Sequence, residues 1–218
     1  VPEVSLFSLP FLMPDNAAVD AVTQGEAGKM VFSAIEKRGV MPLAWGENGF
    51  REISNSRGVL SAPSDLKGLK VRVVGSPLFL DTFNALGANP TQMSWTDALP
   101  ALTTGAVDGQ ENPLAVFDVA RADRADQKYL TLWHYMNDPL IFGVSNRVWS
   151  TLSADDQALL KQAAIDAGAW EIEKSRSELD ATLAAIRERG VEVTELTPEQ
   201  HQAFVQATQK VYEKWTPR

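Results

Sequence analysis

The stretch LKGLKVRVVGSP, residues 66–77, contains an arginine inside a run of valines, Val71-Arg72-Val73-Val74. A glycine precedes the run and Gly75-Ser76-Pro77 follows it, which is the pattern of a short buried strand. Arginine is almost never fully buried unless its charge is paired. Arg72 therefore requires either a carboxylate from elsewhere in the chain or a partner from outside it.

Strand-like and helix-like segments alternate on both sides of this strand. The segment 77–86 predicts a helix, with Pro77 at its first position and Gly87 just past its end. SWTD (94–97) has the spacing of a helix cap, and VDGQENP (107–113) is interpreted as a turn. Strands are predicted at 40–45, 50–54, 129–135, 140–145 and 191–196. The alternation favours an α/β fold.

One predicted helix is unusually long. Between the cap Ser153 and the stop at Gly190 there is no proline, which corresponds to roughly 54 Å of helix. Its apolar residues change face along its length; one stripe contains Leu160, Ala163, Ala167 and Trp170, and the other contains Leu179, Leu183 and Ile186. A single helix that packs on one body and then on a second explains this change, and two helices broken near Gly168 are the alternative.

Composition excludes several classes of function. The chain has 218 residues, 44% of them hydrophobic, a net charge of -8 and no run of basic residues, so it is not expected to bind nucleic acid. No apolar run approaches the length of a membrane span. The absence of cysteine excludes disulfides, thiolate nucleophiles and cysteine-based metal sites.

Motifs for catalysis are also missing from the sequence. No nucleophile elbow, phosphate-binding loop or zinc-binding helix motif occurs. His134 lies in the aromatic segment LWHY and is interpreted as a packed, hydrogen-bonded residue. Asp108 and Glu111 lie three residues apart and could perform acid–base catalysis, although one of them could simply cap the next helix. We therefore predict no enzyme activity, no cofactor and no metal.

The positive signals indicate binding of a carboxylate. A guanidinium offers five donors in a fixed fork and keeps its charge, so Arg72 suits a planar carboxylate. Arg51, in GFREISN, is a second candidate, with a structural ion pair as the alternative. Asn112 offers a donor and an acceptor, or it satisfies a local turn. Trp95 follows a helix cap and either faces a cleft or belongs to the core.

Together, DLKGLKVRV, GANPTQMSWTDALPALTTGAVDGQENP, GFREISNSRG and LSADDQALL resemble the solute-binding proteins of TRAP transporters, the DctP-type family. The resemblance covers essentially the whole chain. It implies a two-lobed, periplasmic-binding-protein-like α/β fold with a cleft between the lobes and a long helix spanning both. Lobe I would comprise 1–48 and 137–176, and lobe II, which carries the carboxylate-binding arginine, 49–136 and 177–218. From the family pattern, we expect that this sequence does not include the N-terminal strands of lobe I or the signal peptide.

The resemblance also implies a function and roles for individual residues. It implies a periplasmic receptor that binds a small organic acid and delivers it to the membrane permease subunits of an ion-coupled TRAP transporter, without inserting into the membrane itself. Arg72 matches the arginine that binds the ligand carboxylate, Arg51 a second basic position, Trp95 an aromatic position and Asn112 a polar one. A ligand-sensing or partner-recruiting domain on the same fold is the alternative.

Overall fold

The computed structural model of the protein describes residues 1–216, and the chain divides into two compact units. Unit 1 comprises Val1–Phe7, Met13–Gly49 and Asn137–Glu178. Unit 2 comprises Ser8–Leu12, Phe50–Met136 and Leu179–Arg218, of which residues up to 216 are described. The sequence therefore alternates between the units, and each unit is assembled from distant segments.

Among the described residues, unit 1 contains four α-helices, most of one 3-10 helix, one complete strand and part of a second. Its elements are α1 (Asn16–Gln24), α2 (Glu26–Glu36), the first part of β1 (Val40–Asn55), β6 (Asn137–Ser145), α6 (Asn146–Trp149) and α7 (Ala154–Ser177); the 3-10 helix η1 (Pro2–Ser8) begins in this unit. Strands β1 and β6 pair with each other. Trp45 of β1 stacks on Phe32 at 4.6 Å between ring centroids and meets Phe7 edge-on at 5.3 Å.

Helix α7 packs on unit 1 through small residues, and the stripe predicted for it is wrong. Leu160 is 39% exposed and Trp170 is 65% exposed, whereas Ala164 and Gly168 are buried. A Cβ at Gly168 would lie 2.2 Å from the carbonyl oxygen of Trp45. The close approach of the helix backbone to β1 therefore requires small residues, and the bulky ones lie on the outer face.

The long helical run is divided at Glu178. Helix α7 ends at Ser177 and α8 (Leu179–Glu188) begins one residue later, so the break is not at Gly168. Helix α7 belongs to unit 1 and α8 to unit 2. Ile186 of α8 is fully buried in a cluster with Phe117 and Leu130. The stripe predicted for α8 therefore packs in unit 2, as inferred. Helix α7 packs in unit 1, but through a face other than the predicted one.

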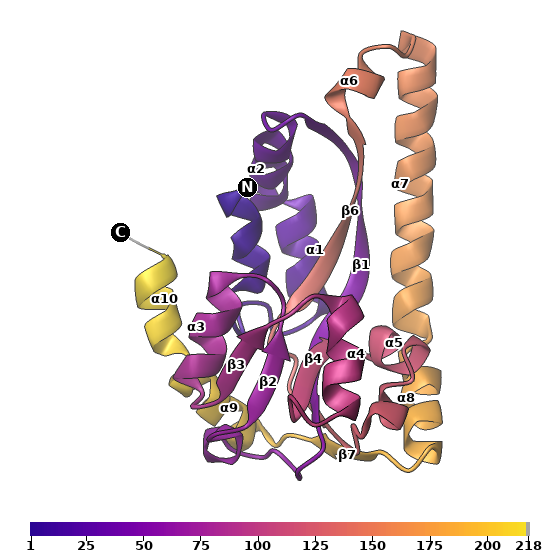
Figure 1. Cartoon of the computed structure of the whole chain (residues 1–218). Coiled ribbons are helices and arrows are strands. Elements are labelled where there is room, and N and C mark those ends of the chain that lie inside the picture. Colours follow the sequence, from indigo (N-terminus) through magenta and orange to yellow (C-terminus); the bar gives the residue numbers. More distant parts are fainter. Residues whose placement is uncertain (217–218) are drawn as a thin grey trace. The chain divides into compact units, whose positions relative to one another are not determined.

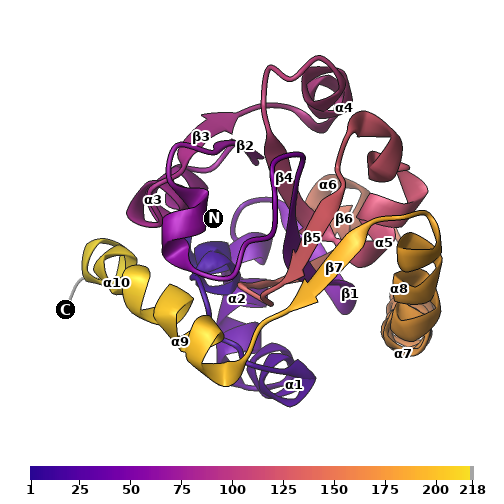
Figure 2. The ribbon, with the colours of Figure 1, turned by 90° about the horizontal axis from the view of Figure 1, so that it is seen from below.

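Unit 2 is a mixed sheet with helices on both faces. Its strands follow the order β3-β2-β4-β1-β5-β7. In chain order its elements after β1 are η2 (Pro63–Leu66), β2 (Lys70–Val73), α3 (Pro77–Ala85), β3 (Asn89–Gln92), α4 (Trp95–Thr103), β4 (Gly109–Pro113), α5 (Leu114–Val119), η3 (Ala122–Ala125), β5 (Tyr129–Leu132), α8, β7 (Glu192–Glu195), α9 (Pro198–Ala207) and α10 (Gln209–Trp215). Figure 1 labels these elements along the chain, and Figure 2 shows α3, α9 and α10 on one side of these strands and α4, α5 and α8 on the other.

Two apolar clusters hold the helices on the sheet. The larger one joins Val71, Val73 and Ile53 of the strands to Phe83 of α3 and Phe204 of α9. On the opposite face, Leu130 packs with residues of α5 and α8. Helices cover both faces of the sheet, which explains why the strand that contains Arg72 consists largely of valine.

The structure corrects three predictions about where strands lie. Residues 40–45 and 50–54 belong to one 16-residue strand, β1. The segment 109–113 is a buried strand, β4, rather than a turn. Gly109 lets this strand approach β1 closely, since a Cβ at this position would lie 2.5 Å from the carbonyl oxygen of Ser54. Strand β5 ends at Leu132, and His134 has a left-handed backbone with φ 49°.

Candidate functional site

The predicted site residues gather at the carboxyl ends of β2, β3 and β4. Strand β2 runs parallel to both β3 and β4, and Arg72 is in register with Thr91 and Gln110. Met93 follows β3 directly, and Trp95 is the first residue of α4. Asn112 is the last residue but one of β4. In open α/β sheets this edge is where ligands bind.

Arg72 is buried, with 3% of its surface exposed, and it has no carboxylate within 4.0 Å among the described residues. Its Nε and Nη2 donate to the carbonyl oxygen of Met93 at 3.0 and 2.9 Å. Burial of the guanidinium lowers the pKa of Arg72, partly offset by the charge of Glu111. The cation is therefore held in place by a neutral acceptor, and no carboxylate of residues 1–216 forms an ion pair with it.

Trp95 provides a face for this guanidinium. The Cζ atom of Arg72 lies 5.3 Å from the centroid of the Trp95 ring. Ser94 caps α4 by accepting a hydrogen bond from the backbone N–H of Asp97, which fixes the position of Trp95 in the first turn. The ring is only partly buried. It therefore covers one face of the cation and remains partly exposed, as a ligand-facing aromatic residue would.

Arg51 takes part in the structural ion pair that the sequence left open. Its Nε and Nη2 donate to the two carboxylate oxygens of Glu111 at 2.5 and 3.0 Å. The same Nη2 lies 2.8 Å from the carbonyl oxygen of Glu111 and 3.0 Å from Oδ1 of Asn112. Tyr135 donates its hydroxyl to Glu111 at 2.7 Å. Within residues 1–216, Arg51 thus pairs with an internal carboxylate, whereas Arg72 has no carboxylate within 4.0 Å.

Asn112 belongs to a buried chain of polar side chains and does not form the local turn considered above. Its Oδ1 accepts from Arg51, and its Nδ2 donates to Oε1 of Gln110 at 2.5 Å. Gln110 donates in turn to the hydroxyl of Ser54, which donates to Gln127. A fully connected network of this kind fixes side-chain positions more tightly than single contacts do.

Sequence reasoning missed Glu111 and Tyr135 as members of this network. Glu111 was considered as a catalytic carboxylate or as a helix cap, and Tyr135 only as part of an aromatic segment. No local pattern pairs residue 51 with residue 111, because the pairing depends on the antiparallel register of β1 and β4. The buried acidic residue within VDGQENP was the one available signal, since a buried carboxylate needs a partner.

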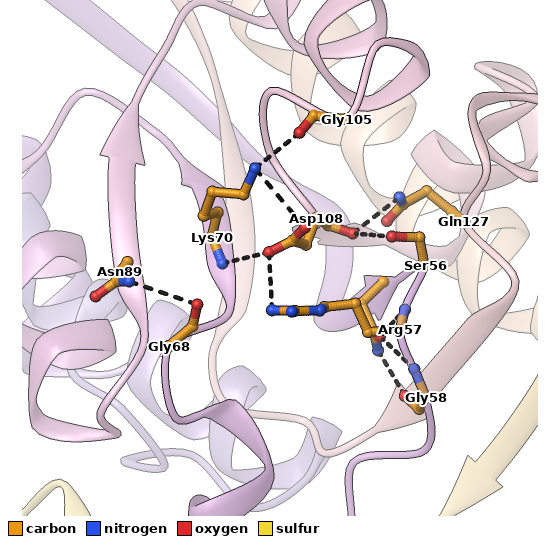
Figure 3. Close-up of polar contacts among 10 residues, drawn as sticks. Ser56, Arg57, Gly58, Gly68, Lys70, Asn89, Gly105, Asp108 and Gln127 are labelled. Carbon is orange, nitrogen blue, oxygen red and sulfur yellow. Dashed lines mark hydrogen bonds and ion pairs between the residues drawn. The ribbon is translucent and has the colours of Figure 1, made fainter.

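The structure places Asp108 and Glu111 in separate environments. Figure 3 shows Asp108 between Lys70 and Arg57. Its Oδ2 accepts from the backbone N–H of Lys70 at 2.9 Å and from Arg57 at 3.4 Å, while its carbonyl oxygen accepts from Ser56. Asp108 therefore joins three segments of the chain, whereas Glu111 is committed to Arg51. The two carboxylates do not form a shared acid–base pair.

His134 is hydrogen-bonded, as predicted, and its partner is a buried carboxylate. Nδ1 of His134 contacts Glu52, which also accepts the backbone N–H groups of Trp133 and His134 at 2.7 and 3.0 Å. Phe50 stacks on the imidazole at 5.1 Å. Burial acts to lower the pKa of His134, but the hydrogen bond and charge of Glu52 outweigh it, and the pKa is raised.

Among residues 1–216, no group of three or more histidine or acidic side chains is arranged to hold a metal ion. No helix there combines the length and the apolar character needed to cross a membrane.

Known proteins that are similar in sequence and structure identify the family of this chain. Residues 1–217 match the family model of the bacterial extracellular solute-binding proteins, family 7. The chain belongs to this family. A TRAP periplasmic solute-binding protein from Ralstonia eutropha, solved with bound (S)-2-acetolactate, has 56% sequence identity and a TM-score of 0.97, and the match covers 99% of this chain and 70% of that one.

Other similar proteins are more distant in sequence. A TRAP periplasmic solute-binding protein from Sulfurospirillum deleyianum, with bound succinate, has 30% identity and a TM-score of 0.93, covering 99% of this chain and 71% of that one. A solute-binding protein of Verminephrobacter eiseniae is 36% identical over 197 residues, which are 88% of this chain and 57% of the relative. The chain thus spans less than two thirds of this curated relative. The predicted family, fold class and extracytoplasmic location are confirmed.

Proposed function

We propose that this chain is the part of an extracytoplasmic receptor that binds the carboxylate of a small organic acid for a TRAP-type transporter. The observation that carries this proposal is Arg72. A buried guanidinium without an internal carboxylate needs an external anion, because an uncompensated buried charge is costly. The solved relatives with bound acetolactate and succinate support the same ligand class.

In this proposal each predicted residue has a distinct role. Arg72 offers the ligand its remaining N–H groups while Met93 fixes the guanidinium plane. Trp95 covers the cation, and Asn112 supplies polar contacts to the rest of the ligand. Arg51 acts as a positioning residue, because its guanidinium is already bonded to Glu111 and Asn112.

The two compact units correspond, in this proposal, to the two lobes of the receptor. The carboxylate-binding residues all belong to unit 2. The receptor would pass its ligand to the permease subunits of the transporter and would perform no catalysis. Asp108 and Glu111, the carboxylates considered for acid–base work, have structural partners instead.

Titration calorimetry with a matched ligand pair tests the proposal. We expect (S)-2-acetolactate to bind and its neutral amide to bind at least about 100-fold more weakly, since the amide has no charge to offer the buried cation. Arg72→Met should abolish this difference. Native mass spectrometry of the purified protein would show whether an organic acid is already bound. Failure of every small carboxylate to bind, or equal binding of acid and amide, would overturn the proposal.

A further inference from the structure

Glu52 is a buried acidic residue that holds a segment of unit 2 next to the candidate site. Its side chain is 1% exposed. Its Oε2 accepts the backbone N–H groups of Trp133 and His134 at 2.7 and 3.0 Å, and its Oε1 contacts Nδ1 of His134. Strand β5 ends at Leu132, so these contacts hold the chain to β1 after the pairing of β1 with β5 has ended.

The contact with Glu52 also stabilises an unusual backbone conformation. His134 is left-handed, with φ 49°. A residue with a side chain adopts this region at a cost, although histidine does so more often than most residue types. Because Glu52 binds both the backbone and the imidazole of His134, it offsets this cost. The path of the chain from His134 to Tyr135 therefore depends on Glu52.

Tyr135 connects this segment to the candidate site. Its hydroxyl donates to Glu111 at 2.7 Å, and Arg51 donates to the same carboxylate. Glu111 is followed on β4 by Asn112, which is in register with Glu52 on β1. A shift of Tyr135 would therefore disturb groups that hold Asn112 in place.

His134 is the member of the pair that changes its charge near neutral pH. Its side chain is 50% exposed, so it can exchange its proton with solvent. Burial lowers the pKa of His134, but the hydrogen bond and charge of Glu52 and the charge of Glu195 on β7 raise it, and the net effect is a raised pKa. His201, on α9, is the further titratable group whose charge acts on this imidazole. The proton of His134 is therefore lost above the ordinary histidine pKa of about 6.5.

We propose that Glu52 and His134 form a positioning pair for the ligand site, so that the receptor binds its organic acid more tightly when His134 is protonated. This inference rests on the proposed function and adds a pH dependence to it. The charge-assisted contact of the protonated imidazole holds the chain against β1 and places the hydroxyl of Tyr135 at Glu111. Loss of the proton weakens this contact, the left-handed turn is held less firmly, and the affinity falls.

Titration calorimetry with (S)-2-acetolactate at about pH 6 and about pH 8.5 measures the effect. The ligand stays ionised over this range, since carboxyl pKa values are about 3.3–4.3. We expect Kd to be at least about fivefold lower at the lower pH. Thermal unfolding without ligand, at both pH values, shows that the protein is folded in each titration.

His134→Asn removes the titration and keeps a contact with Glu52, because the side-chain nitrogen of asparagine is attached to Cγ, as Nδ1 of histidine is. Asparagine also tolerates the left-handed backbone. The Kd values of this variant at the two pH values should agree within about twofold. His201→Gln is the matched control, because it removes the other of the two histidines in the chain. Burial lowers the pKa of His201, so this variant should keep the fivefold or larger ratio.

A measurement on the unmodified protein keeps the test decisive if His134→Asn does not fold. Linkage is reciprocal, so a ligand that prefers the protonated protein must raise the pKa of His134 and take up a proton near that pKa. Calorimetry in two buffers of different ionisation enthalpy counts the protons, and the imidazole NMR signals of the two histidines show which of them titrates.

The outcomes separate this inference from the proposed function. If no small carboxylic acid binds at either pH, the proposed function and this inference both fail. If the acid binds equally at both pH values without proton uptake, the receptor stands and the role of the Glu52–His134 pair is refuted. A folded His134→Asn protein that keeps the pH dependence would refute that role in the same way.

Discussion

Arg72→Lys separates the positive charge of the site from its geometry. The substitution keeps one positive charge on β2, but it replaces a planar fork by a single ammonium group. In the structure, the carbonyl oxygen of Met93 accepts from two guanidinium nitrogens. A lysine ammonium at this position can satisfy Met93 but then has no second nitrogen aligned for a carboxylate.

The expected loss is that of one charge-assisted hydrogen bond to the ligand. Such a bond contributes about 1.5–3 kcal/mol, which corresponds to roughly 10- to 150-fold in Kd. The cation–π contact with Trp95 is retained in part, because an ammonium also interacts with an aromatic face. Arg72→Lys should therefore weaken carboxylate binding by about two orders of magnitude at most, without unfolding unit 2.

Titration calorimetry with (S)-2-acetolactate measures this effect, and thermal unfolding without ligand confirms that the variant is folded. Arg57→Lys is the control, because Arg57 lies in the same unit but its side chain is 58% exposed and makes a long contact of 3.4 Å with Asp108. Its Kd should remain within twofold of the unmodified protein. A folded Arg72→Lys protein that also binds within twofold would show that the fork of Arg72 does not hold the ligand.

Three further predictions concern stability. Arg176→Met should destabilise unit 1 by about 3–5 kcal/mol in chemical denaturation. Arg176 makes two hydrogen bonds to the buried carboxylate of Glu47, and the variant leaves that charge unpaired. An unchanged midpoint of the denaturation curve would contradict this prediction. Gly168→Ala should cost about 1–3 kcal/mol despite its better helix propensity, since its Cβ would meet the carbonyl oxygen of Trp45 at 2.2 Å; a stabilised variant would refute that contact. Because the pKa of His134 is raised in the folded protein, its protonated form stabilises the fold at low pH, and this contribution is lost as pH rises through the raised pKa. The difference in unfolding free energy between the unmodified protein and His134→Gln should therefore shrink from about pH 5 to about pH 8. A pH-independent difference would argue against the ion pair.

Local chemistry allowed parts of the fold to be predicted. The helix from Pro77 ends at Ala85, close to the predicted end before Gly87, and the cap at Ser94 opens a helix at Trp95. These boundaries depend on residues within a few positions of each other. Strand β2 was equally readable, since its valines and flanking turn residues determine it without reference to distant segments.

Elements that depend on distant contacts were misread. Gly109 suggested a turn, but its lack of a side chain lets β4 approach Ser54 of β1. In the same way, β1 continues through Glu47 because Arg176, 129 positions away, neutralises that carboxylate inside unit 1. A glycine or a glutamate has several uses, and the partner that selects one of them lies far away in the sequence.

The two arginines of the candidate site show the same limit for function. Both lie in strands and both are buried, so their local sequences do not distinguish a ligand-binding arginine from a structural one. The antiparallel register of β1 and β4 brings Arg51 to Glu111, whereas the parallel register of β2 aligns Arg72 with the neutral Gln110. Strand pairing, rather than residue type, thus determines which cation is neutralised by the protein. It leaves Arg72 as the charge that an external carboxylate would complete.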